Sequence, residues 1–478
     1  MAGHSLKSKR KMLYITDRLT DLFEQLWTTD ADALEKATEV DAEREEGKTR
    51  GPLHGIPLMA KDNMASKDKM EITSGSWATM GRFVVSKLRE SGAISLRQPN
   101  LSEWTSMRSY WYSDGFSARV DQIRSPYDLS KSPFGSCGGS IVAVAANLVP
   151  LTCGTETDGS IIGPAQINAI VGIKPTPGLT SRNGIIPASL SFDTVGLMAR
   201  TLADAVIGME AIMGEDGRDP LTKLSSVRRE SNYSQYLNGK AGLKGARFAL
   251  PKELVEKIFE GMKQAGAEIL EMDYPCAEDR IAPNGKWDWD VGTASRREFT
   301  VLQTEIYNRK FEDILEYNIE NTGSEGANAG DHPAFPTGHD IFQKIADHRG
   351  VEDQEYKDAL AYIRRMTRDE GIDAVLANGP ERGNKSFDAI ILSDRRLVGQ
   401  QIAAQAGYPT ITVSIGVDKD SMPVGVTLQQ SAWKEGILIK LAHGIECVRD
   451  EVLGGRPLPR YVDHLAKNIP IGRKHVKL

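Results

Sequence analysis

Two short loops rich in glycine and serine, separated by an apolar segment, constrain this chain more than any other feature. The first loop covers Gly135 to Ser140 and the second covers Asp158 to Ser160. Glycine lets the backbone approach a ligand closely because no Cβ stands in the way, so such loops place N–H groups and small hydroxyls at a site. The segment between them predicts a helix over residues 140–146 and a strand over residues 149–153. These loops are the first candidates for a functional site.

The composition is that of a globular protein that binds small ligands. Of the 478 residues, 40% are hydrophobic and 26% are charged, which is enough apolar material for a packed core. The 59 basic and 65 acidic residues give a net charge of -6. A chain without positive surplus has no electrostatic attraction for nucleic acid or an anionic membrane. We therefore expect a small molecule or a peptide as the ligand.

The cysteines and the apolar runs indicate the compartment. The longest apolar run, residues 141–153, contains Asn147 and Pro150 and is shorter than the roughly 20 residues that span a bilayer. No apolar segment follows the basic residues near the start of the chain, so no secretory signal is predicted. Four cysteines lack the spacing of metal ligands or of a disulfide framework: Cys137, Cys153, Cys276 and Cys447. We expect a cytoplasmic protein without a membrane span.

Short apolar runs alternate with amphipathic stretches, which predicts an α/β fold. Strands are predicted just before Lys61 and at 247–250, 268–272, 373–377, 410–415 and 424–429. Helices are predicted at 14–46, 83–91, 201–213, 252–265, 295–317, 353–371, 396–406 and 433–449. The helix at 201 begins with a capping-box pattern formed by Thr201 and Asp204. Residues 322–338, rich in glycine, asparagine and proline, predict a functional loop or a lid.

Serine with lysine is the chemistry that remains after several familiar signatures are excluded. No serine lies in a nucleophile-elbow pattern, no GxGxxG is present, and the eight histidines lack HExxH spacing. We expect a packing or hydrogen-bonding role for His54. A serine hydroxyl needs a base, and Lys61 serves as that base if burial keeps its amine neutral. From the residues alone, a surface or ion-paired lysine is the more common interpretation, and two such loops are more often turns or a phosphate cradle than a catalytic pair.

The complete motifs resemble those of one family of enzymes. In chain order they are GPLHGIPLMAKDN from Gly51, GSCGGS from Gly135, TETDGSIIGPAQINAIVGIKPTPGLTSRNGIIPAS from Thr155 and DTVGLMARTLADA from Asp193, followed by GQQIAAQAGYPTITVSIGV from Gly399. Together they resemble the amidase signature family, whose members hydrolyse amides with a serine, cis-serine, lysine triad. TETDGSI, together with LSEW at Leu101 and HPAFP at His332, is most similar to the peptide-amidase-like branch and its fungal relatives.

The resemblance implies a role for each matching residue. Ser160 would be the nucleophile, Ser136 the serine that follows a cis peptide bond after Gly135, and Lys61 the general base. Ser136 would relay the proton from Ser160 to Lys61 and return it to the leaving amine. The backbone N–H groups of the second loop would form the oxyanion hole; these belong to Thr157, Asp158, Gly159 and Ser160. No metal or organic cofactor is expected.

The chain also departs from the family pattern. Phe134, Gly135, Ser136 and Cys137 stand where the family often has Gly-Gly-Ser-Ser, and Ile162 stands where it often has arginine. Cys137 is a weak alternative nucleophile, since it occupies the position of a loop serine. The segments after Ser76 and after Gly242 are shorter than in relatives, and ISLRQPN replaces a more usual ILGKTN.

The resemblance implies one large α/β domain with a mixed central sheet flanked by helices. An N-terminal helical segment would cover residues 1–50 and the amidase signature catalytic domain residues 51–470. The expected reaction is hydrolysis of a carboxamide, a C-terminal peptide amide or a small aliphatic or aryl amide, through an acyl-enzyme on Ser160. Two alternatives remain open: the amidase subunit of a tRNA-dependent amidotransferase, and a catalytically silent family member.

Overall fold

The structure is a computed structural model of the chain. It describes residues 27–29, 32–64, 86–109, 114–117, 121–250, 256–272, 316, 340–347, 354–378, 386–393 and 398–459. The predicted loop at 322–338 lies outside these residues, as does the predicted helix at 295–317 apart from residue 316. No helix of the described part is both long and apolar enough to cross a membrane.

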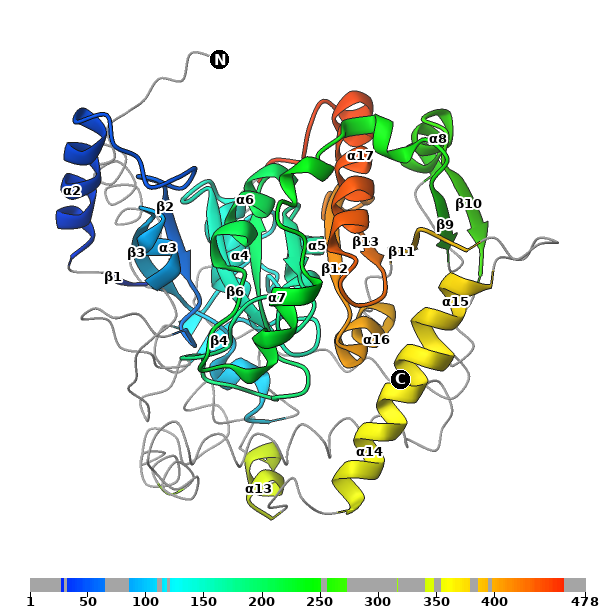
Figure 1. Ribbon diagram of the computed structural model, residues 1–478, viewed down its shortest axis with the longest axis horizontal. Helices are drawn as coiled ribbons and strands as arrows, with labels where there is room; N and C mark the ends of the chain where they lie inside the picture. The colour runs from blue at the N-terminus through cyan, green and yellow to red at the C-terminus, as the bar shows by residue number, and fades with distance from the viewer. Residues whose placement is uncertain are drawn as a thin grey trace.

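A mixed sheet of eleven strands forms the centre of the described part (Figure 1). From one edge to the other its strands are β1 (Trp27–Thr29), β3 (Ile94–Pro99), β2 (Pro57–Ala60), β6 (Leu151–Glu156), β8 (Thr194–Ala199), β7 (Val171–Lys174), β12 (Thr410–Val417), β13 (Pro423–Gln429), β11 (Ala389–Leu392), β9 (Arg247–Leu250) and β10 (Glu268–Glu271). β2 is parallel to β3 and β6, and β9 is parallel to β10 and β11, whereas the other neighbours are antiparallel. A separate pair consists of β4 (Phe116–Ser117) and β5 (Asp121–Gln122).

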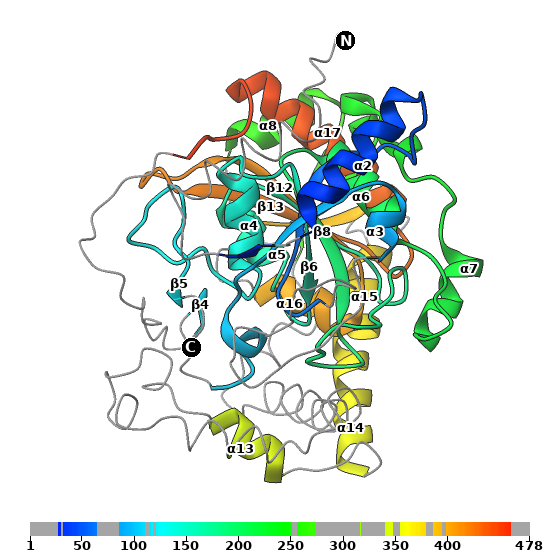
Figure 2. The same cartoon turned by 90° about the vertical axis from the view of Figure 1, so that its left-hand side faces the viewer.

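Helices cover both faces of this sheet. The α-helices of the described part are α2 (Ala33–Glu45), α3 (Ser86–Glu90), α4 (Gly138–Ala145), α5 (Ile162–Ile167), α6 (Leu202–Ile212), α7 (Ser225–Arg228), α8 (Glu256–Gln264), α13 (Asp340–Asp347), α14 (Gln354–Arg364), α15 (Asp373–Ala377), α16 (Val398–Ala406) and α17 (Glu435–Leu453). Figure 2 shows α17 and α8 above strands β12 and β13 and α16 below them. In Figure 1, α14 projects from the main body toward the bottom of the view.

The alternation of side chains along β2 shows how the two faces differ. Leu58 and Ala60 pack into a core cluster with α3, α6, α8 and α17, whereas Met59 packs on the opposite face with α2, α4 and α5. Successive residues of a strand point to opposite faces, so a strand buried on both faces reads as a continuous apolar run. All four residues of β2 are buried. The architecture predicted from the sequence, a mixed sheet between helices, is therefore confirmed.

Most predicted elements are present with shifted ends. The capping residue Thr201 starts α6, where its hydroxyl oxygen accepts a hydrogen bond from the Asp204 N–H at 3.2 Å. Gly92, the residue after the helix predicted at 83–91, follows α3 with a left-handed φ of 82°. α2 confirms the second half of the helical stretch predicted at 14–46, and it packs beside β3 at the sheet edge.

The strand predicted at 373–377 is wrong, because these residues form α15. This segment continues directly from α14 through a π-helical stretch, Arg365–Ile372, and buries Val375 and Leu376 against α16. A run of four apolar residues after Asp373 cannot be assigned to helix or strand by periodicity, and here it follows the preceding helical stretch. The helix predicted at 14–46 is wrong for Trp27–Thr29, because these residues form the strand β1, which pairs with β3. Strands β3, β4, β5, β7, β8 and β11 were not predicted as strands, since each is a short run without a clear alternating pattern.

Candidate active site

Lys61 directly follows β2 and lies completely inside the protein. Its backbone N–H donates to the carbonyl of Cys153 in β6 at 3.1 Å, which continues the pairing of the two strands by one residue. The side chain has no solvent exposure. Its Nζ lies 2.7 Å from Ser136 Oγ, 3.0 Å from Thr155 Oγ1 and 3.3 Å from Thr155 O. Burial lowers the pKa of Lys61, which favours the neutral amine that a base requires.

The Lys61 amine donates to three oxygens, namely Ser136 Oγ and the two oxygens of Thr155. Ser136 and Thr155 are both buried. These contacts therefore hold the amine against the Ser136 hydroxyl inside the protein.

The loop that carries Ser136 is fixed by neighbours on both sides. Ser102, from the LSEW motif, donates its N–H to Ser136 O at 3.3 Å and its hydroxyl to Gly135 O at 3.1 Å. Helix α4 begins directly after the loop, and Gly139 in its first turn is in close contact with Asn100, since a Cβ there would lie 2.3 Å from Asn100 O. Ser136 is 1% exposed. The hydroxyl is thus held at a buried position facing Lys61.

The bond between Gly135 and Ser136 is trans, since the described residues contain no cis peptide bond. The cis bond expected from the family resemblance is therefore wrong for this structure. Phe134 and Gly135 instead both adopt left-handed conformations, with φ of 67° and 63°. These two residues turn the chain so that Ser136 faces Lys61. Gly135 is required there for a second reason, because a Cβ would lie 2.8 Å from Pro164 Cδ.

The second loop joins β6 to α5 and carries Ser160. The carbonyl of Ser160 accepts a hydrogen bond from the Cys137 N–H at 3.3 Å, which brings the two loops together. Ser160 is partly exposed, and within the described part of the chain its hydroxyl has no hydrogen-bond partner. Gly159 adopts a left-handed φ of 88°. The backbone N–H groups of Gly159 and Ser160 likewise donate to no other described residue, so both are available to a ligand.

The buried carboxylate of Glu156 binds the backbone at the end of this loop. Its Oε2 accepts hydrogen bonds from the N–H groups of Ile161 and Ile162, at 2.7 and 2.9 Å. The contact closes the turn between the last residue of β6 and the first turn of α5. Ile162, which stands where relatives often carry arginine, is completely buried in the core under the loop.

Three supporting residues lie inside the quoted motifs, but the sequence assigned them no role. Thr155 contacts Lys61 through two oxygens, and Asn63 Nδ2 donates to Thr155 Oγ1 at 2.9 Å. Asp193 Oδ1 accepts a hydrogen bond from the Thr157 hydroxyl at 2.5 Å. Each pair joins segments far apart in the chain, so no local pattern reveals the contact. The only sign of a role in the sequence was their place inside the motifs that resemble the family: Asn63 lies two residues after Lys61, and Thr155 and Asp193 each begin a motif.

The buried position of Cys137 argues against the alternative that this residue is the nucleophile. The thiol is completely buried, and its Sγ donates to Thr155 O at 3.2 Å. Burial raises the pKa of Cys137, which disfavours the reactive thiolate.

His54 has the packing role expected of it: it is 4% exposed, and its Nε2 lies 2.9 Å from Val40 O. Trp104 is also a core residue and packs edge-on against Phe342, with ring centroids 5.4 Å apart.

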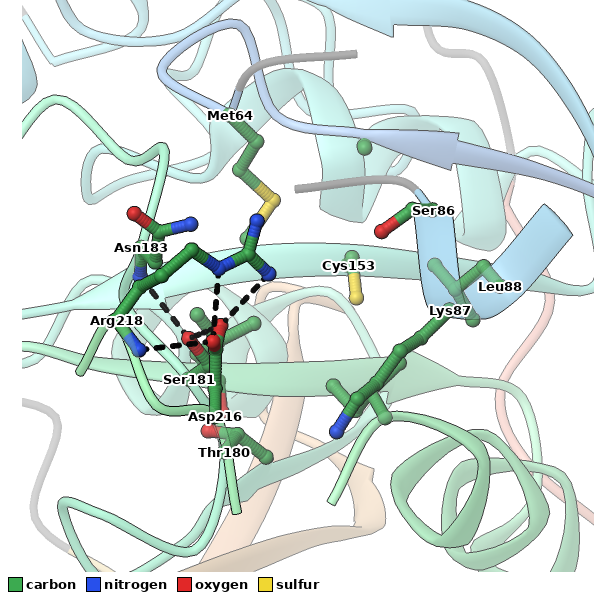
Figure 3. A pocket seen from close by; sticks show the side chains of 13 residues that line it. Met64, Ser86, Lys87, Leu88, Cys153, Thr180, Ser181, Asn183, Asp216 and Arg218 are labelled. Carbon is green, nitrogen blue, oxygen red and sulfur yellow. Dashed lines mark hydrogen bonds and ion pairs between the residues drawn. The ribbon is translucent and has the colours of Figure 1, made fainter. Parts of the chain in front are cut away.

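A separate cavity lies on the other side of β2, between α3 and α6 (Figure 3). Ala60 and Cys153 contribute to its wall, and the ion pair between Arg218 and Asp216 lies at its rim. None of Lys61, Ser136 and Ser160 lines this cavity. The site of interest is therefore the loop junction described above and not the cavity of Figure 3.

The fold and this loop junction define the class of the protein, and comparison with known proteins agrees. The family model named Amidase matches residues 14–439, which is most of the chain. The chain therefore belongs to the amidase signature family.

Individual proteins similar to this chain include amidases and a subunit of an amidotransferase. A protein of Schizosaccharomyces pombe named as an amidase is 40% identical over 92% of this chain and 81% of its own length. The native peptide amidase from Stenotrophomonas maltophilia is 34% identical, with a TM-score of 0.85 over 95% of this chain and 96% of that chain. One subunit of the glutamyl-tRNA(Gln) amidotransferase from Alkaliphilus metalliredigens is 28% identical over 87% of each chain. The peptide-amidase-like resemblance seen in the sequence is thus confirmed.

Proposed function

We propose that this protein hydrolyses a carboxamide to a carboxylate and ammonia or an amine, through an acyl-enzyme on Ser160. The observation that carries the proposal is the buried contact between Lys61 Nζ and Ser136 Oγ at 2.7 Å, beside a loop whose serine hydroxyl is left available. Membership of the amidase family supports the same chemistry. The triad consists of Lys61, Ser136 and Ser160.

The first half of the reaction forms the acyl-enzyme. Ser160 Oγ attacks the amide carbon while its proton passes to Ser136 Oγ, whose own proton passes to Lys61 Nζ. The carbonyl π electrons move onto oxygen and give a tetrahedral oxyanion. When the oxyanion collapses, the C–N bond breaks, and the proton held by Lys61 returns through Ser136 to the departing nitrogen. Ammonia or an amine leaves, and Ser160 carries the acyl group as an ester.

The second half repeats these steps with water. A water molecule attacks the ester carbon while its proton moves through Ser136 to Lys61, and the proton then returns to Ser160 Oγ as the carboxylic acid is released. The oxyanion of each step would be bound by the backbone N–H groups of the second loop, from Thr157 to Ser160. In other acyl-transfer enzymes one such donor contributes about 2.7–4 kcal/mol.

We further propose linear amides as substrates, either C-terminal peptide amides or small aliphatic and aryl amides. The similarity to a peptide amidase supports the first class. A panel of amides from both classes, with ammonia detected enzymatically, tests the proposal on the purified chain. Release of ammonia by wild type and none by Ser160→Ala is expected. Failure of the folded wild type to hydrolyse any member would favour the catalytically silent alternative.

Membership in a tRNA-dependent amidotransferase complex is the second candidate, since a subunit of such an enzyme is found among the relatives. The chain would then release ammonia from glutamine for a partner and would act in a complex. Glutamine in the panel, with size-exclusion chromatography of the chain alone and with candidate partner proteins, separates the two. Activity of the isolated chain on peptide amides supports the free-standing enzyme.

We also propose a cellular location, a class of partners and a domain division for this protein. We infer a cytoplasmic location, a small-molecule or peptide substrate and no nucleic-acid partner from the charge balance and composition. The division into a helical segment at 1–50 and a catalytic domain at 51–470 also remains a proposal. Of the described residues before residue 50, β1 pairs with β3 as the edge strand of the main sheet and α2 packs beside β3.

A further inference from the structure

Asp193 is a buried carboxylate beside the second loop that the proposed mechanism does not use. It is 6% exposed and directly precedes β8. One oxygen accepts a hydrogen bond from the Thr157 hydroxyl at 2.5 Å. The other accepts from the N–H groups of Ala188 and Ser189, at 2.8 and 2.9 Å. These three donors satisfy the buried carboxyl group and offset part of the cost of its burial.

The strand register explains why Asp193 meets Thr157. Glu156 lies opposite Thr194 in the last pair of the ladder between β6 and β8. Thr157 and Asp193 are therefore the first residues beyond that pair, and their side-chain bond holds the chain ends together where the backbone ladder stops. This is also the point at which the chain turns toward Ser160. The bond consequently fixes the start of the proposed oxyanion loop.

The same carboxylate is linked to the base on its other side. Ala188 and Ser189 belong to a loop in which Ile186 donates its N–H to Asn63 O at 2.8 Å, while Asn63 Nδ2 donates to Ile186 O at 3.3 Å. Asn63 also donates to Thr155 Oγ1, the oxygen that contacts Lys61. Hydrogen bonds thus link the Lys61 amine to the loop that holds Asp193, and Asp193 in turn to Thr157.

We propose that Asp193 is a positioning residue, which aligns the Thr157 backbone N–H toward the oxyanion and keeps the oxyanion loop in register with Lys61. This inference rests on the proposed amidase function. Asp193 acts through the Thr157 hydroxyl and does not touch the substrate. Oxyanion donors must lie 2.7–3.1 Å from the developing charge, and a misplacement of about 1 Å costs on the order of a hundredfold in rate. Loss of the contact therefore lowers kcat more than it changes KM.

Paired substitutions of Thr157 test the proposal. Thr157→Val keeps the shape of the side chain and removes the hydroxyl, whereas Thr157→Ser keeps the hydroxyl. We expect Thr157→Val to lower kcat by about 10- to 100-fold with KM within about threefold, and Thr157→Ser to restore kcat to within about threefold of wild type. The matched control is Thr412→Val, which removes the buried hydroxyl that donates to Val426 O at 3.0 Å in β13. Its kcat should equal that of wild type.

A boronic acid analogue of the amide substrate provides the second readout. It forms a tetrahedral adduct with the nucleophile, so its affinity should fall in Thr157→Val by the same factor as kcat. Equal kcat in wild type and Thr157→Val, or equal losses in Thr157→Val and Thr412→Val, would overturn the positioning role. If Thr157→Val does not fold, Asp193→Asn decides by the same criteria: a kcat loss with unchanged KM supports the role, and wild-type kcat refutes it.

The design distinguishes failure of this inference from failure of the proposed function. If wild type hydrolyses no amide, or if Ser160→Ala remains active, the amidase mechanism itself is wrong. If Ser160→Ala is inactive and Thr157→Val has wild-type kcat, only the role of Asp193 is wrong.

Discussion

Replacement of Lys61 by methionine separates catalysis from stability. Methionine has a length similar to that of lysine and lacks the amine, so Lys61→Met removes the contacts to Ser136 Oγ at 2.7 Å and to Thr155 Oγ1 at 3.0 Å. General-base catalysis contributes about 10²- to 10⁴-fold in rate. We therefore expect kcat/KM to fall by that factor, which corresponds to a barrier higher by about 3 to 5.5 kcal/mol.

The stability of this variant should change little. Thr155 Oγ1 keeps its hydrogen bond from Asn63 at 2.9 Å, and Thr155 O keeps the contact from Cys137 at 3.2 Å, so only the Ser136 hydroxyl loses its partner. An unsatisfied buried hydroxyl costs about 1–3 kcal/mol. Removal of a completely buried amine offsets part of that cost, because the amine no longer has to be desolvated. The free energy of unfolding should stay within about 2 kcal/mol of wild type.

The assay combines ammonia release on the best amide of the panel with urea denaturation of each variant. Lys174→Met is the matched control, since Lys174 is equally buried and its Nζ donates to the carbonyl oxygens of Tyr408, at 2.7 Å, and Pro175, and not to Ser136. We expect this control to lose less than about tenfold in kcat/KM. More than about a tenth of wild-type activity in folded Lys61→Met, or equal losses in both variants, would refute the assignment of Lys61 as the base.

Three further perturbations test the structure around the site. Thr201→Ala should lower the free energy of unfolding by about 1 kcal/mol through loss of the α6 cap, without a change in kcat, as urea denaturation and kinetics can show. Gly139→Ala should lower it by about 1–3 kcal/mol, because the new Cβ would lie 2.3 Å from Asn100 O; an unchanged melting temperature would contradict this contact. Asp193→Asn should gain stability relative to wild type as the pH rises from 4 to 7. Burial raises the pKa of Asp193 from 3.8 to about 6 despite the nearby charge of Arg182. The protonated side chain therefore contributes its full stability to the fold below about pH 4, and this contribution is lost as the pH rises through 6. The expected gain is on the order of 3 kcal/mol, and a difference that does not vary with pH would contradict the raised pKa.

The three residues of the proposed triad could be named from the sequence because they lie in long contiguous motifs. Lys61 follows a strand whose apolar run is visible in the sequence, and Ser136 and Ser160 stand in loops marked by glycine. The contacts that support them could not be predicted in the same way. Thr155 lies 94 residues from Lys61, and Asp193 lies 36 residues from Thr157. Only the register of neighbouring strands brings such residues together.

The errors have physical reasons of the same kind. The five residues of α15 form a helix because a preceding helix continues into them, which their own apolar pattern does not show. The cis bond before Ser136 was expected from relatives and not from local residues. In this structure left-handed Phe134 and Gly135 supply the turn instead. The residue types of the candidate site could therefore be predicted better than the backbone conformation that positions them.

Labelling of the nucleophile tests the central claim most directly. The full chain would be treated with a fluorophosphonate, digested and mapped by mass spectrometry, with Ser160→Ala as the parallel sample. Our account predicts one phosphonylated residue, Ser160, with loss of amide hydrolysis in proportion to labelling, and no label in the variant. A label on Cys137 or another residue, or hydrolysis that persists after Ser160 is fully modified, would contradict it.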